Sequence, residues 1–168
     1  MAPESNKNVP DLLLARAGSS PGKTFLFSEI DGREWTYAEF DSAVNRTANM
    51  LASHGIGKGD VVSLLLPNSP EYIIAYFACW KIGALAGPVN SLLKTEEIEW
   101  VVRNSEAKLI LSEPSALADG QLGNNVPIIT SWPPTDAGGS DQLDDVDIDT
   151  DDDAIIIYTS GTTGKPKG

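Results

Sequence analysis

Short apolar runs alternate with helix-like segments along most of this chain, and this alternation limits the fold more than any other feature. Mainly apolar runs at residues 61–66, 85–89 and 108–111 are typical of buried strands. Between them, residues 70–82 and 95–104 carry apolar side chains at helical spacing. Strands that alternate with helices form a parallel sheet with right-handed crossovers. The sequence therefore predicts an α/β fold containing part of a layered parallel sheet.

Capping and turn residues mark the boundaries of further elements. Thr36 and Glu39 match a capping box at the start of a helix, and Gly55 can end that helix in a left-handed conformation. The turn dipeptide Asp31-Gly32, flanked by residues 24–27 and 33–35, predicts a hairpin. Other expected elements are a helix over residues 9–17, a helical turn around 115–118 and a strand over 126–130.

Charge and cysteine usage exclude several classes of protein. The formal net charge of −12 argues against nucleic acid and against anionic membranes as partners. The longest uninterrupted apolar run, residues 72–80, is too short for a transmembrane segment, and no signal-peptide core is evident. A single cysteine, Cys79, suits a reducing compartment. We therefore expect a cytoplasmic protein.

Two reactive side chains and one aromatic helix have both functional and structural interpretations. His54 could act as a general base, but no partner acid is apparent, so a structural role at a helix end is favoured. Cys79 lies in the helix predicted over residues 70–82, which is rich in aromatic side chains. It is better explained as a small core residue than as a nucleophile. The aromatic side chains of that helix could line an apolar pocket, although core packing is the preferred interpretation.

The segment before the C-terminal motif is strongly acidic. Between residues 136 and 153 there are nine aspartates and neither lysine nor arginine. A calcium site is conceivable, but the Asp-x-Asp spacing lacks a full ligand loop. We interpret residues 132–153 as a solvated acidic linker and residues 1–8 as a disordered tail.

Residues 154–168 carry the most specific motif. An apolar, β-branched run at 154–158 predicts a strand, and a loop rich in glycine, hydroxyl and lysine side chains follows it. Glycine lets backbone N–H groups turn toward an anion, while hydroxyls and lysines add donors and positive charge. The loop consists of Thr159, Ser160, Gly161, Thr162, Thr163 and Gly164, followed by Lys165-Pro166-Lys167-Gly168.

Two other interpretations of this loop are a connecting loop without a binding function and the Walker loop of a P-loop NTPase. A Gly/Ser/Thr-rich loop after a strand is often only a connection. A P-loop NTPase is excluded by spacing, because a Walker loop has four residues between its first glycine and Gly-Lys. Here two residues separate Gly161 from Gly164-Lys165, and Pro166 takes the place of the Walker serine or threonine.

The run from Tyr158 to Gly168 resembles the phosphate-loop motif of the adenylate-forming superfamily, which comprises acyl- and aryl-CoA synthetases, peptide-synthetase adenylation domains and luciferases. The likeness extends over about residues 24–168, and the form Pro88-Val89-Asn90 is more similar to CoA ligases. The other matching segments are residues 35–39, 57–62, 65–71, 81–84 and 106–108.

The resemblance implies an acid–thiol ligase. The complete enzyme would convert a carboxylate and MgATP to an acyl-adenylate and pyrophosphate, then pass the acyl group to a thiol, usually that of CoA. The phosphate loop would be mobile and close over ATP. By resemblance, the residues that bind the ATP phosphates are Thr159, Ser160, Gly161, Thr162, Thr163, Gly164 and Lys167.

The chain resembles only the N-terminal portion of the superfamily's large domain. It shows no counterpart of the adenine-binding segment, the magnesium-binding glutamate, the ribose-binding aspartate or the C-terminal domain with its catalytic lysine. No catalytic or metal-binding residue is therefore assigned here, and the Mg²⁺ and CoA sites are expected mostly on the missing part. We expect that part to be a second polypeptide, without which the chain is inactive; a homodimer of the complete enzyme remains open.

Two alternative functions remain. An adenylation enzyme that loads a carrier protein differs only in the thiol acceptor. A truncated interaction module would keep the architecture without turnover. The sequence does not identify the carboxylic acid that is activated.

Overall fold

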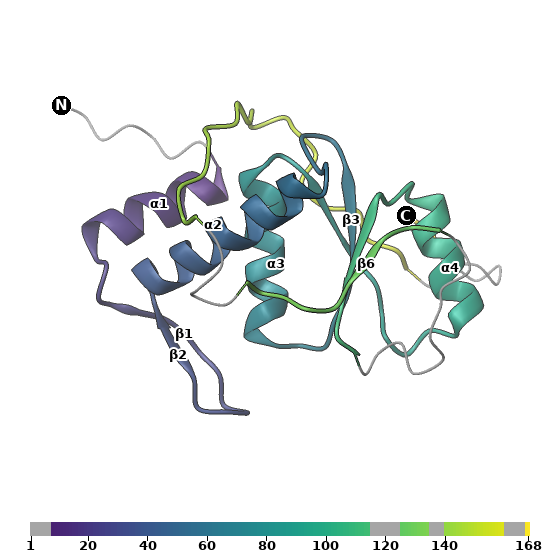
Figure 1. The fold of residues 1–168 in the computed structure, drawn as a ribbon, viewed down its shortest axis with the longest axis horizontal. Coiled ribbons are helices and arrows are strands. Elements are labelled where there is room, and N and C mark those ends of the chain that lie inside the picture. Colours follow the sequence, from purple (N-terminus) through teal and green to yellow (C-terminus); the bar gives the residue numbers. More distant parts are fainter. Residues whose placement is uncertain (1–7, 115–124, 135–139, 160–166) are drawn as a thin grey trace.

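A computed structural model describes residues 8–114, 125–134, 140–159 and 167–168. Its centre is a four-stranded sheet whose neighbouring strands are all parallel, in the order β4-β3-β5-β6 (Figure 1). The strands are β3 (Val61–Leu65), β4 (Leu85–Pro88), β5 (Leu109–Ser112) and β6 (Ile128–Ile129). The predicted α/β fold is confirmed. Residues 1–7 of the predicted tail and the turn predicted around 115–118 lie outside the described residues.

The strand β3 is the middle of the sheet. Val62 pairs with Ala86 of β4 on one side and with Leu109 of β5 on the other. All five residues of β3 are buried, so both of its faces are covered. This explains the continuous apolar run in the sequence, since a strand buried on both faces does not need to alternate with polar residues.

Helices cover the two faces of the sheet. The helices α1 (Val9–Ser19), α2 (Tyr37–Ser53) and α3 (Pro70–Lys81) lie on one face, and α4 (Thr95–Asn104) lies on the other (Figure 1). Val62 and Leu64 pack in the cluster with the first group, whereas Val61 and Leu65 pack with α4. Alternate residues of one strand thus supply two separate cores.

Local signals set most helix ends as the sequence predicts. The amide of Glu39 donates to Thr36 Oγ1 at 3.2 Å, and the amide of Thr36 donates to Glu39 Oε2 at 2.8 Å, which completes the capping box of α2. Ser69 caps α3 by accepting from the Tyr72 amide at 3.3 Å. Gly55, with φ of +80°, follows α2 in the predicted left-handed conformation.

The first helix is longer than predicted. It continues through Gly18 to Ser19, and the amide of Ser20 closes it by donating to the Arg16 carbonyl at 2.8 Å. The boundary is set by Pro21, because a residue before proline is disfavoured in the helical region. Ser20 accordingly has φ of −145°. Gly18 lies inside the helix and does not end it.

A hairpin precedes α2, as predicted. It consists of β1 (Thr24–Phe27) and β2 (Glu34–Thr36), with Gly32 at φ of +70° in its turn. Arg33 ties the hairpin to the first turn of α3 through an ion pair of 2.6 Å with Glu71.

The aromatic helix α3 packs against its neighbours. Ile74, Ala78 and Cys79 are buried, and the Phe77 ring meets Phe40 of α2 edge-on, with centroids 5.3 Å apart. These contacts favour the core-packing interpretation of the aromatic side chains. Within the described ranges, no helix is both long enough and apolar enough to cross a membrane.

A polar cluster joins α2 to α3. The ammonium of Lys81 donates to Asp41 Oδ1 and to Asn45 Oδ1, both at 2.5 Å. The side chains of Lys81 and Asp41 are only 9% and 13% exposed. Removing one member of such a pair leaves the other charge buried without compensation.

We therefore expect Lys81→Met to lower the free energy of unfolding by about 3 kcal/mol, because Asp41 loses its cation. Urea unfolding measures this change. The double variant Lys81→Met/Asp41→Leu should recover most of the loss, and Lys23→Met, at an exposed lysine, serves as the control. A loss for Lys81→Met no larger than that of the control would contradict the assignment.

Candidate phosphate-binding site

Residues 154–159 extend the sheet beyond β4. The Ala86 amide donates to the Ala154 carbonyl at 3.0 Å, and the Ile156 amide donates to the Ala86 carbonyl at 3.1 Å. These bonds form one parallel bridge between Ala86 and Ile155. The segment therefore runs in the same direction as β4 and occupies the position of a fifth strand.

The strand predicted over residues 154–158 is reduced to this bridge. The ladder bonds of β4 that face the segment come from alternate residues, here 86 and 88. Residue 88 is Pro88, which has no N–H to donate to the carbonyl of Ile156. The sequence contains this proline, but only the structure shows which neighbour it faces.

Side chains of the segment alternate between two environments. Ile156 and Tyr158 pack against the cluster around α4. Ile155 and Ile157 point the other way and are 40% and 55% exposed. The register at Ala86 therefore determines which side chains reach α4.

The base of the predicted loop is closed by a pair of backbone hydrogen bonds. The amide of Thr159 donates to the Lys167 carbonyl, and the amide of Lys167 donates to the Thr159 carbonyl, both at 2.9 Å. Directly opposed residues of an antiparallel pair have side chains on the same face. The Thr159 hydroxyl and the Lys167 ammonium therefore lie on one face, and both residues are exposed.

The opposite face of the loop base is held against α4. The Tyr158 hydroxyl donates to Asn104 Oδ1 at 2.8 Å, and its ring meets Trp100 edge-on, with centroids 5.8 Å apart. Burial raises the pKa of Tyr158, so the phenol retains the proton that it donates. Gly168 lies against this ring, since a Cβ at that position would be 2.7 Å from a ring carbon.

The structure describes only part of the predicted site. It brings together Thr159 and Lys167 at the loop base. The other predicted phosphate-binding residues, Ser160, Gly161, Thr162, Thr163 and Gly164, lie outside the described residues. Sequence reasoning missed the supporting residues Trp100 and Asn104. No local pattern could have indicated them, because Asn104 is 54 residues from Tyr158 along the chain.

The loop base, formed by Thr159 and Lys167, lies at the edge of the sheet where open α/β folds bind ligands. The chain leaves β3 for α3 on one face and leaves β4 for α4 on the other. In open α/β sheets, ligands bind outside the carboxyl ends of the strands where this change of face occurs. Thr159 follows a segment parallel to β4, so it lies at that same edge.

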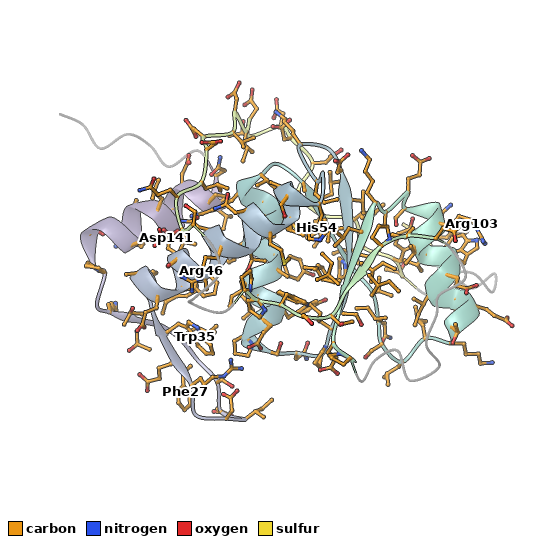
Figure 2. All side chains as sticks on the ribbon, viewed as in Figure 1. Phe27, Trp35, Arg46, His54, Arg103 and Asp141 are labelled. Carbon is orange, nitrogen blue, oxygen red and sulfur yellow. The ribbon has the colours of Figure 1, made fainter. Side chains whose placement is uncertain are left out.

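The other candidate residues do not join this site. His54 ends α2, is exposed, and has Nδ1 2.9 Å from the Met50 carbonyl (Figure 2). Burial raises the pKa of the Cys79 thiol to about 12, so at neutral pH it remains a protonated core residue. Among the residues that the structure describes, no group of three or more His, Cys, Asp or Glu side chains could hold a metal ion.

The α/β fold is that of the N-terminal part of adenylate-forming enzymes, and comparison with known proteins gives the family. The chain belongs to the AMP-binding enzyme family, whose model matches residues 13–168. The resemblance seen in the sequence is thereby confirmed.

The chain is similar to CoA ligases and to acyl-CoA synthetases. The chain is 36% identical over 170 residues to a crotonobetaine/carnitine–CoA ligase from Citrobacter koseri, covering 90% of this chain and 33% of that protein. It is similar to the N-terminal domain of FACL13 from Mycobacterium tuberculosis, with a TM-score of 0.85, 31% identity, and coverage of 96% of this chain and 43% of that one. A third similar structure is O-succinylbenzoate coenzyme A synthetase from Bacillus subtilis in complex with AMP, with a TM-score of 0.75 and 31% identity over 93% of this chain and 40% of that one. The chain thus spans about a third of the length of the curated relative that it matches.

The contact between Gly168 and Tyr158 gives a direct test of the loop base. We expect Gly168→Ala to push the Tyr158 ring away and to weaken the Thr159–Lys167 pair, at a cost of about 1–3 kcal/mol, typical of overpacking. Hydrogen exchange at the amides of Thr159 and Lys167 should accelerate accordingly. Gly22→Ala is the matched control, because nothing lies within 4 Å of a Cβ built there. Equal exchange rates at these two amides in both variants would show that the contact between Gly168 and Tyr158 does not support the Thr159–Lys167 pair.

Proposed function

We propose that this chain supplies the ATP phosphate-binding loop of an acyl-CoA synthetase. The observation that carries the proposal is the shared face of Thr159 and Lys167 at the carboxyl edge of the sheet. Membership of the AMP-binding enzyme family and the likeness to CoA ligases support it.

The side chains at the loop base suit a phosphate group. A hydroxyl donates a hydrogen bond to a phosphate oxygen, and an ammonium adds a positive charge next to it. Both residues are exposed and their side chains face the same way, so an anion can reach the two groups together. The proposal extends the site to Ser160, Gly161, Thr162, Thr163 and Gly164, as the sequence predicts.

In the proposed reaction, MgATP supplies the adenylyl group to which the substrate carboxylate is joined as an acyl-adenylate, with pyrophosphate as the leaving group. Thr159 and Lys167 would bind the β- and γ-phosphates and stabilise the negative charge that develops there. The anchored base would orient the loop, since Tyr158 is fixed to α4 immediately before Thr159.

Other components of the reaction are assigned to polypeptide outside this chain. The chain spans 33% of the carnitine–CoA ligase, and we propose that the adenine, Mg²⁺, CoA and acyl sites lie mostly in the corresponding remainder. The substrate would be a small carboxylic acid, with fatty acids, aryl acids and carnitine-like acids as the first candidates. The second polypeptide and the cytoplasmic location remain predictions.

Lys167→Ala in the full-length protein tests the role of the loop. We expect ATP–pyrophosphate exchange to fall by about 10²-fold, because one donor to the developing charge is lost. Exchange is measured with whichever acid of a fatty, aryl and carnitine panel supports it best. Lys23→Ala, at an exposed lysine of the same chain, should exchange at the wild-type rate. An unchanged rate for Lys167→Ala would exclude this role for the lysine.

Transfer to CoA is tested separately from adenylation. Formation of an acyl-CoA after addition of CoA supports the synthetase, whereas exchange without acyl-CoA formation would favour a carrier-protein acceptor.

A further inference from the structure

The register of residues 154–159 beside β4 is weakly fixed by the sheet itself. Within the part of the chain that the structure describes, the bridge at Ala86 is the single pairing of this segment with β4, and Pro88 removes the next donor. A slip of one residue would turn every side chain of the segment to the opposite face of the sheet. Tyr158 would then leave α4, and Thr159 and Lys167 would lose their common solvent face.

A side chain of α3 holds the start of this segment. The indole N–H of Trp80 donates to the Ala154 carbonyl at 2.8 Å, the same oxygen that accepts from the Ala86 amide. The Trp80 ring is itself positioned by Tyr76 and Phe77, whose ring centroids lie 5.5 and 5.3 Å away. The indole N–H therefore binds the Ala154 carbonyl and not the carbonyl of an adjacent residue, which favours one register of the segment.

Residues 140–153, which we call the acidic strap, lead to Ala154 and also contact the rest of the protein. Its first residues follow α2, where Asn49 Nδ2 donates to the carbonyls of Ser140 and Gln142 at 2.8 and 2.9 Å. Ser42 Oγ of α2 donates to Asp141 Oδ2 at 3.2 Å, and Figure 2 labels Asp141 beside this helix.

Lys58 fastens the other end of the acidic strap. Its ammonium donates to the Asp147 carbonyl at 2.9 Å and pairs with Asp152 Oδ2 at 2.6 Å. The same carboxylate oxygen accepts from the Asp149 amide at 2.7 Å, so the turn that carries Asp152 is closed around the lysine contact. The hydrogen bond from Lys58 lowers the pKa of Asp152.

The aliphatic part of the Lys58 side chain packs against Gly83, where an added Cβ would be 3.0 Å from Lys58 Cγ. Gly83 has φ of +69° and follows α3, and its carbonyl accepts from the Gly59 amide at 2.8 Å. Lys58 therefore links the end of α3 to the residues just before Ala154.

We propose that Trp80 and Lys58 are positioning residues for the phosphate loop, because together they set the register in which residues 154–159 leave β4. This inference rests on the proposed function of the loop. In the described part of the chain, Trp80 acts through Ala154 and Lys58 acts through the acidic strap. An exposed ion pair such as Lys58–Asp152 contributes little to global stability, so its effect should appear at the loop.

The test uses the full-length protein with MgATP as the probe. Trp80→Phe removes the indole donor and keeps an aromatic ring, and Lys58→Gln removes the cation. We expect each to weaken MgATP binding in calorimetric titration by about three- to tenfold, the effect of losing one hydrogen bond. Hydrogen exchange at the Ile156 amide should accelerate by a similar factor, while exchange at Leu64 in β3 stays at the wild-type rate. Lys58→Arg retains the charge, so its MgATP affinity and its exchange rate at the Ile156 amide should match those of the wild type.

Matched controls remove equivalent groups elsewhere. Trp132→Phe deletes an indole that donates to the Ser112 carbonyl at 3.2 Å beside β5, and Lys23→Gln neutralises an exposed lysine. Both should bind MgATP as the wild type does. Unchanged MgATP affinity in Trp80→Phe and Lys58→Gln, or equal acceleration at Ile156 and Leu64, would overturn the inference. If the wild type itself does not bind MgATP, the proposed function fails, and unchanged exchange at Ile156 in the variants would then refute the positioning role independently.

Discussion

The pairing of β3 with a parallel strand on each side is the constraint on which the rest of the structure depends. Because β3 is buried on both faces, helices must cover the sheet twice, with α3 on one face and α4 on the other. The carboxyl ends of the strands then meet at a single edge. β4 supports the segment that ends in Thr159, so the position of the proposed phosphate-binding residues Thr159 and Lys167 follows from the pairing at the centre of the sheet.

Features set by neighbouring residues could be predicted from the sequence. Thr36 and Glu39 form the expected capping box because its two hydrogen bonds join residues three apart. The helix over 95–104 has the predicted limits, and the hairpin turns at Asp31-Gly32. The phosphate loop is predicted from its motif, since the residue types that it needs lie next to one another in the chain, and its role stays a prediction.

Features set by distant residues could not be predicted. Trp80 and Ala154 are 74 residues apart, and Tyr158 and Asn104 are 54 apart, so no periodic pattern connects them. The aspartates of the acidic strap suggest a solvated segment when they are considered alone. Two of them contact Lys58 only because the fold places the α2–β3 connection beside the acidic strap. Similarly, Pro88 weakens the last pairing because of the strand that it faces, which the sequence does not specify.

Hydrogen exchange of the full-length protein with and without MgATP tests the proposal that the ATP phosphates bind to Thr159, Ser160, Gly161, Thr162, Thr163, Gly164 and Lys167. We expect slower exchange in the peptide spanning residues 154–168 when MgATP is present, and loss of that protection in Lys167→Ala. Synthesis of an acyl-adenylate with no change of exchange in this peptide would contradict it.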